Sequence, residues 1–313
     1  MTDFDLDGID GGNPLGFLAA LGTIAVASRC LSDDAPRLAW STRLGAWRPH
    51  LVLRAERHRD DLVDALHREL TAASDHLAFS IGDDLSLALD AFRKSALLMQ
   101  AKAAPQHRVG ADFLSAFGSD AIEVSTNDKP AGKIADTAFR TMSGAGHQHF
   151  LGTMRTLVRD TTIAHLEKAL FAQWRYDDPL EKHSMRWDPH DDVRRALRWN
   201  NPSGDRERQR TGSMWGANRL AIEALTLLPT IPVRNRLRTT GFREVPRQGA
   251  LWTWPIWTAP IGLDSIRSLL ALSDLQHDSP DRDNLTARGI AEVYRTKRIT
   301  QDKYRNLVIA NPA

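Results

Sequence analysis

Histidine and aspartate side chains between residues 183 and 192 form the densest set of potential metal ligands in the chain. His190 and Asp191 are adjacent, as in metal-dependent phosphohydrolases, where such a pair bridges metal ions. That chemistry needs further ligands at suitable helical spacing, whereas His190 follows Asp188 and a proline, a sequence typical of turns. The candidates for a metal site are His183, His190 and Asp191. We expect no cofactor and interpret the aspartates as caps and turn formers.

The sequence contains no convincing catalytic set. Its one cysteine, Cys30, ends an apolar stretch and is expected to be a core or helix-end residue. A single cysteine excludes an internal disulfide framework and a cysteine-based zinc site. No serine lies in a G-x-S-x-G elbow. We therefore expect a protein that is not an enzyme.

A glycine-rich stretch from Gly8 to Gly16 could in principle cradle a phosphate at a helix N-terminus. Its spacing matches neither the dinucleotide fingerprint nor the lysine-bearing P-loop. Pro14 removes one backbone amide, and Asp10 would repel an anion. The stretch is interpreted as a tight structural turn.

Arginine is concentrated between Arg186 and Arg305, and its first cluster lies between residues 194 and 219. Only Asp205 and Glu207 oppose the arginines there. Guanidinium groups match phosphate oxygens, while asparagine side chains can position the strand. The nucleic-acid-binding candidates of this cluster are Arg194, Arg195, Arg198, Asn200, Asn201, Arg206, Arg208, Arg210, Asn218 and Arg219. A solvated, disordered loop remains the alternative for residues 203–211.

Two further basic clusters follow along the chain. Arg234, Arg236 and Arg238 alternate along an expected strand, so that one face would be purely cationic. Near the C-terminus, basic residues are interleaved with Tyr294 and Tyr304, a composition typical of a groove that tracks a nucleic-acid backbone. The candidates of this last cluster are Arg295, Lys297, Arg298, Lys303 and Arg305. Trp252 and Trp254 could stack on bases, but we expect them to be packing residues.

The elements that position these residues indicate an α+β fold of small mixed sheets and packed helices, with helical content rising in the middle and near the C-terminus. Asn13 followed by Pro14 predicts a helix start. Periodicity predicts further helices at residues 58–73, 85–103, 149–174, 215–228, 263–275 and 285–294. It predicts strands at residues 4–9, 47–53, 184–188, 193–199, 231–236 and 250–257.

The net charge of +2 conceals an asymmetry. Residues 1–185 carry 20 basic and 25 acidic side chains, whereas residues 186–313 carry 21 basic and 14 acidic ones. We predict an acidic assembly domain at residues 1–180 and a basic nucleic-acid-contacting domain at residues 181–313. A basic half suggests a polyanion partner. The alternative is that the arginine content reflects a GC-rich genome and that these charges are simply solvated.

No stretch approaches the roughly 18 apolar residues that a membrane span requires. The first residues are acidic, unlike the basic start of a signal peptide. We expect a cytoplasmic protein without a membrane partner.

Three stretches resemble subunits of CRISPR effector complexes (Cascade), in particular the type I-U/I-G group. They are DGGNPLGFLAALG, ALRWNNPSGD with GANRLAIEAL, and WPIWTAPIGLDSIRSLLAL with ARGIAEVYRTKRI. The resemblance implies a large or accessory subunit of a crRNA-guided antiviral surveillance complex. Such subunits contact DNA beside the target and dock a helicase-nuclease, while RNA–DNA pairing selects the sequence. The chain is short for a large subunit.

The sequence thus favours a non-catalytic subunit that contacts crRNA or target DNA, lies beside other effector-complex subunits and helps recruit a helicase-nuclease. The first alternative is a metal-dependent nuclease or phosphohydrolase that uses His183, His190 and Asp191. The second is a structural adaptor whose basic half contacts an acidic protein.

Overall fold

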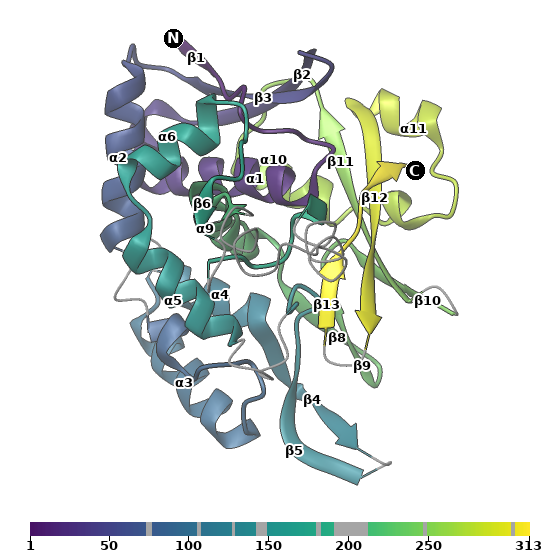
Figure 1. Cartoon of the computed structure of the whole chain (residues 1–313). Coiled ribbons are helices and arrows are strands. Elements are labelled where there is room, and N and C mark those ends of the chain that lie inside the picture. Colours follow the sequence, from purple (N-terminus) through teal and green to yellow (C-terminus); the bar gives the residue numbers. More distant parts are fainter. Residues whose placement is uncertain are drawn as a thin grey trace, which may run out of the picture.

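The computed structural model describes residues 1–72, 77–104, 108–126, 129–141, 149–179, 183–190, 212–246, 249–301 and 304–313. Helices pack with several small antiparallel sheets, so the class is α+β as predicted (Figure 1). No helix within these ranges is long and apolar enough to cross a membrane.

Helix α1 (Pro14–Cys30) lies at the centre of the fold. As predicted, Asn13 caps it: the side-chain oxygen accepts hydrogen bonds from the backbone N–H groups of Leu15 at 2.8 Å and Gly16 at 3.3 Å. Residues 14 to 27 are all buried, so the helix is covered on every side rather than along one stripe. Its neighbours must therefore come from several parts of the chain.

The first neighbour is a three-stranded antiparallel sheet with the order β1-β3-β2. Its strands are β1 (Thr2–Asp5), β2 (Arg37–Arg43) and β3 (Ala46–Leu53). A short 3-10 helix, η1 (Ser32–Asp34), joins α1 to β2. Trp40 of β2 stacks on Phe17 of α1 with ring centroids 5.8 Å apart, which fixes the sheet on the helix.

The second neighbour is a helical layer (Figure 1). It consists of α2 (Arg59–Ala72), α5 (Phe150–Asp160), α6 (Ile163–Phe171) and α9 (Trp215–Ala224), which continues into η5 (Leu225–Leu227). A single helix was predicted over residues 149–174, but the chain breaks between α5 and α6, where Thr162 forms a capping box with His165. A Cβ built on Gly22 of α1 would lie 1.8 Å from the backbone oxygen of Leu220 in α9, so the two helices require glycine at their contact.

The third neighbour is the C-terminal antiparallel sheet, in the order β10-β11-β12-β13 with β14 also paired to β12. The strands are β10 (Phe242–Val245), β11 (Gly249–Trp257), β12 (Ile290–Gln301), β13 (Tyr304–Leu307) and β14 (Asn311–Pro312). Helix α10 (Leu263–Leu270), η6 (Ser273–Gln276) and α11 (Arg282–Ala287) connect β11 to β12. Trp252 and Trp254 of β11 are fully buried and both pack against Phe17 of α1, so they are packing residues.

The remaining elements form the end of the molecule opposite β1, where the β4–β5 hairpin projects (Figure 1). They are η3 (Leu77–Ser80), α3 (Leu89–Lys102), α4 (Val109–Phe117), β4 (Gly118–Thr126), β5 (Lys129–Asp136), and the hairpin of β8 (Thr230–Val233) with β9 (Arg236–Thr239). A two-residue ladder joins β6 (Asp178–Pro179) to β7 (Gly212–Ser213).

One hydrophobic cluster runs from Phe4 of β1 to Leu307 of β13. It includes side chains of α1, α9 and β11, and a small separate cluster lies under α11. The predicted boundary near residue 180 therefore does not divide the molecule into two cores.

Two predicted elements are wrong in type. The helix expected at residues 285–294 ends at Ala287, and β12 begins at Ile290 after Gly289, which adopts a φ of +80°. Residues 184–188 were expected to form a strand, but they have no regular secondary structure and are buried. The strand predicted at residues 193–199 lies outside the described residues.

A buried ionic network joins α1, α2 and α9. The Glu223 carboxylate of α9 accepts from Arg219 at 2.8 Å and from Arg29 of α1 at 2.6 Å. Arg29 also donates to Glu69 of α2 at 2.7 Å, and Arg219 donates to the Leu70 carbonyl at 3.1 Å. Two cations and two anions thus balance: Arg219 and Glu223 are fully buried, whereas Arg29 and Glu69 are partly exposed.

Candidate nucleic-acid interface

The β8–β9 hairpin presents an arginine-bearing surface. Ile231 pairs with Arg238 and Val233 with Arg236, and partners in an antiparallel ladder lie on the same face. Arg236 and Arg238 are exposed, as is Arg234, which occupies the turn between the strands with a φ of +54°. The prediction that these arginines alternate along one strand therefore holds for Arg236 and Arg238, while Arg234 lies at the tip.

These three guanidinium groups have no acidic counterpart within the described ranges. No ion pair of Arg234, Arg236 or Arg238 occurs there, whereas Arg243 on the next strand is paired with Asp278 at 2.6 Å. Exposed arginines without carboxylate partners are free to bind phosphate oxygens. We call Arg234, Arg236 and Arg238 the arginine ribbon.

Arg298 of β12 lies next to the base of the arginine ribbon. Its Nη1 donates to the Ala138 carbonyl at 2.8 Å, and the Ala138 N–H donates to the Thr239 hydroxyl of β9 at 2.8 Å. Burial lowers the pKa of Arg298, and the nearby cationic Arg305 lowers it further. Lys297 and Arg305 are half-buried on the same pair of strands. The C-terminal basic cluster therefore adjoins the arginine ribbon through Ala138.

Arg295 was a predicted contact, but the fold already uses its guanidinium. It donates to the Thr253 hydroxyl at 3.0 Å and to the backbone oxygens of Leu275, His277 and Asp278 at 3.2, 2.6 and 3.0 Å. These bonds hold the segment after η6 against β11 and β12. Arg295 thus has a structural role, and its half-buried side chain stays only a predicted contact.

The predictions for Asn218 and Arg219 are corrected, because both side chains are only 1% exposed. Asn218 accepts from the Met185 N–H at 2.9 Å and donates to the Met214 carbonyl at 3.0 Å. Arg219 belongs to the buried network with Glu223. Neither side chain can reach a nucleic acid in this structure.

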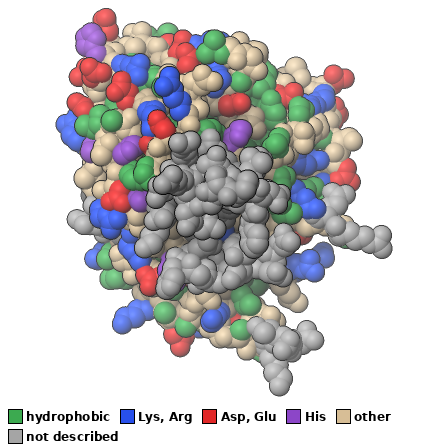
Figure 2. Space-filling model, in the orientation of Figure 1, with side chains coloured by type: hydrophobic (Ala, Val, Ile, Leu, Met, Phe, Trp, Pro, Cys, Tyr) green, Lys and Arg blue, Asp and Glu red, His purple; other side chains and the backbone are tan. Residues whose placement is uncertain are grey.

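The other predicted contacts lie outside the described residues. They are Arg194, Arg195, Arg198, Asn200, Asn201, Arg206, Arg208, Arg210 and Lys303. Acidic and basic side chains are mixed over the coloured part of the face seen in Figure 2, so the described residues form no uniform charged patch there.

The two described histidines of the metal hypothesis have separate partners. His183 lies 2.8 Å from Asp160 and stacks on Trp215 at 3.9 Å. His190 packs against Tyr176, and its backbone N–H donates to Asp188 at 3.0 Å. Within the described ranges, three potential ligands come together at Asp3, Asp5 and His50, where Arg43 also pairs with Asp5. Asp191 lies outside the described residues.

Cys30 ends α1, as predicted. Burial raises the pKa of its thiol to about 11, so the thiol is protonated at neutral pH. It therefore lacks the thiolate that nucleophilic chemistry requires.

The glycine-rich turn is structural, as predicted, and it also forms one wall of a pocket of about 570 Å³. Other parts of the wall come from the β2–β3 turn, Tyr294 of β12 and the segment before β14. The lining residues are Asp10, Gly12, Asn13, Pro14, Gly45, Ala46, Pro189, His190, Tyr294, Ile309 and Ala310. The sequence carries no local signal for this pocket, because its walls come from five distant segments.

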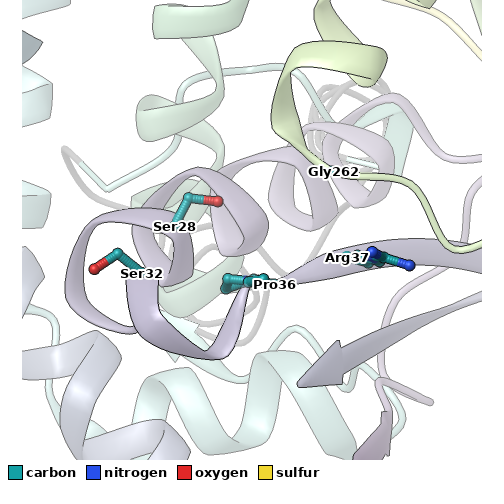
Figure 3. A pocket seen from close by; sticks show the side chains of 6 residues that line it. Ser28, Ser32, Pro36, Arg37 and Gly262 are labelled. Carbon is teal, nitrogen blue, oxygen red and sulfur yellow. The ribbon is translucent and has the colours of Figure 1, made fainter. Parts of the chain in front are cut away.

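A second recess of about 260 Å³ lies between the end of α1, β2 and the start of α10. Its polar side chains are Ser28, Ser32 and Arg37, which point in different directions (Figure 3). These groups do not converge on one position, so the recess lacks the arrangement that a specific ligand needs.

Comparison with known proteins identifies no matching family model and no matching curated protein.

Proposed function

We propose that this chain is a non-catalytic subunit of a crRNA-guided CRISPR effector complex in which the arginine ribbon contacts the phosphate backbone of crRNA or target DNA. The observation that carries the proposal is the exposure of Arg234, Arg236 and Arg238 without an acidic counterpart among the described residues. Three exposed cations on one small hairpin would repel one another unless solvent or an anion screens them.

The hairpin also has a suitable shape. A two-stranded ribbon is narrow enough to enter a nucleic-acid groove, and its arginines can bind phosphates on either side. Lys297 and Arg305, both half-buried, lie beyond the ribbon on β12 and β13, and the guanidinium of Arg298 between them is bonded to the Ala138 carbonyl. The resemblance to type I-U/I-G subunits supports the same class of ligand, and docking of a helicase-nuclease on this subunit belongs to the proposal.

The test uses a variant in which all three arginines of the ribbon are changed to glutamine together. Binding of the full chain to a labelled single-stranded 20-mer DNA, the same RNA, and a DNA duplex would be measured across a salt titration. Each phosphate contact contributes about 0.7 to the logarithmic salt slope for a single strand and about 0.9 for a duplex. Arg234→Gln with Arg236→Gln and Arg238→Gln should therefore reduce the slope by about 2–3 and weaken binding.

The matched control removes three exposed arginines elsewhere, by Arg37→Gln with Arg54→Gln and Arg68→Gln. It makes the same change in net charge and should leave the slope nearly unchanged. Equal losses in both triple variants would show a general charge effect, and an unchanged slope in the ribbon variant would refute the proposed surface.

A further inference from the structure

The pocket beside the glycine-rich turn combines a carboxylate with an aromatic ring. A Cβ built on Gly12 would lie 3.3 Å from Asp10 Oδ1 and 3.3 Å from two ring atoms of Tyr294. The acid and the ring thus meet at Gly12, which has no side chain to separate them. The volume of about 570 Å³ falls within the range of roughly 300–1,000 Å³ that is usual for small-molecule pockets.

Both groups are held in place by the fold. Asp10 Oδ1 accepts from the Gly12 N–H at 2.8 Å and keeps a second lone pair, and within the described ranges Oδ2 has no hydrogen-bond partner, so both oxygens can accept from a ligand. Tyr294 stacks on the buried Trp254 with ring centroids 6.0 Å apart, and Trp254 donates to the Gly11 carbonyl at 2.9 Å. Asn13, another lining residue, donates to the buried Asp188 at 3.1 Å. A rigid site of this kind needs little reorganisation when a ligand binds.

The charge of the pocket selects the chemistry of its ligand. The described residues that line it include one carboxylate, Asp10, and one imidazole, His190, and none of them is a lysine or arginine. A phosphate would be repelled, whereas a group with N–H donors would be attracted. Burial raises the pKa of the Tyr294 hydroxyl, and Asp10 adds to this effect, so the hydroxyl remains a hydrogen-bond donor at neutral pH.

We propose that this pocket binds one unpaired nucleobase, preferentially guanine, with Tyr294 stacked on the ring and Asp10 accepting from its N–H edge. Guanine presents two adjacent donors, N1–H and the 2-amino group, which match the two oxygens of a carboxylate. Adenine and cytosine present an amino group beside an acceptor, which a carboxylate satisfies only in part. Base stacking on an aromatic side chain is worth roughly 1–3 kcal/mol.

The pocket and the C-terminal basic cluster share strand β12, which favours a base over an unrelated small molecule. Tyr294 and Arg298 are on the same strand, four residues apart, a separation of roughly 13 Å at about 3.3 Å per residue. A strand whose phosphates are bound at the arginine ribbon, which adjoins Arg298, therefore passes close enough to place a nearby base in the pocket. This inference rests on the proposed function for the source of the base, but the base site itself can be tested alone.

The probe is free guanosine, which has no phosphate and so does not depend on the arginines. Binding to the full chain would be followed by ligand-observed NMR, with inosine, cytidine, uridine and spermidine in parallel. Guanosine should bind at least tenfold more tightly than inosine, which lacks the 2-amino donor. Asp10→Asn should remove this preference, because the amide retains the oxygen that accepts from the Gly12 N–H but loses the charge.

Two further variants separate the site from the fold and from the arginine ribbon. Gly12→Ala places a methyl group where the acid and the ring meet, and it should weaken guanosine binding severalfold while the thermal midpoint changes little. The ribbon triple variant should bind guanosine like the wild type while losing oligonucleotide affinity. Failure of the base site would leave oligonucleotide binding intact, so the two proposals can fail separately.

Three results would overturn the base site. They are the absence of guanosine binding, an unchanged guanosine preference in Asp10→Asn, and binding of spermidine but not guanosine. The last result would identify a site for cationic amines.

Discussion

Glu223 is a fully buried carboxylate that lies between two guanidinium groups. Burial alone would raise its pKa, but the charges of Arg29 and Arg219 outweigh burial and lower the pKa to about 2. The side chain therefore remains ionised in the interior at neutral pH. Its role is to neutralise two arginines that could not otherwise be buried there.

Removal of this charge should destabilise the protein strongly. Glu223→Gln leaves Arg29 and Arg219 without their shared anion, and breaking a buried pair in this way costs about 3–5 kcal/mol. Urea unfolding of the variant measures the loss. Glu69→Gln is the matched control, because Glu69 is partly exposed and pairs with Arg29 alone, and its cost should stay below about 1 kcal/mol.

The same carboxylate should give a defined dependence of stability on pH. Its pKa falls from an ordinary value of 4.5 to about 2 on folding, so its contribution is complete above pH 4.5 and is lost as the pH falls toward 2. At about 1.4 kcal/mol per pH unit, the full contribution is about 3 kcal/mol. The difference in unfolding free energy between wild type and Glu223→Gln should shrink across this window. Parallel stability curves would contradict this assignment.

At the residue scale, the sequence alone did not distinguish buried arginines from exposed ones, or either of these from arginines bonded to the backbone. Arg219, Arg236 and Arg295 all belong to basic clusters, yet the first is buried in an ionic network, the second is exposed, and the third binds backbone carbonyls. A charge count records none of these differences, because they depend on acceptors from distant segments. Glu223 of α9, for example, lies 194 positions from Arg29 along the chain.

At the element scale, the contact between α1 and α9 is the most closely constrained. Gly22→Ala would place a methyl carbon 1.8 Å from the Leu220 oxygen, a backbone atom that can move only with its helix. Overpacking of this kind costs about 1–3 kcal/mol. Thermal or urea unfolding should show this loss.

Gly262→Ala provides the control for the helix contact. A Cβ at Gly262 meets nothing within 4 Å, so this variant should lose at most about 1 kcal/mol through the N-cap preference of α10. Equal stability of the two variants would contradict the close approach of α1 to α9.

Elements whose start is determined by residues next to it in the sequence were predicted well. The start of α1 follows from the capping by Asn13 and the fixed φ of Pro14, which need no distant partner. The start of β12 was misassigned as helix, although Gly289 and the β-branched and aromatic residues from Val293 to Thr300 carried a strand signal. The pocket had no local signal, since Asp10 and Tyr294 are brought together only by the tertiary fold.

At the scale of the whole molecule, one core joins the two predicted domains. Truncation at residue 180 would remove α9 and β11, and it would expose the leucines of α1 that these elements cover. We expect residues 1–180 alone to lack a cooperative thermal transition and dispersed amide resonances. Co-expression with residues 181–313 should restore both properties, whereas a folded monomeric 1–180 fragment would contradict the single core.

The central position of α1 also has a consequence during synthesis. The helix leaves the ribosome before its partner α9, which follows roughly 200 residues later, and at about 5–20 residues per second this takes roughly 10–40 s. For that interval, its apolar surface has no final partner. Folding of this chain should therefore be slow, dominated by long-range contacts, and most vulnerable to aggregation before translation reaches the C-terminal half.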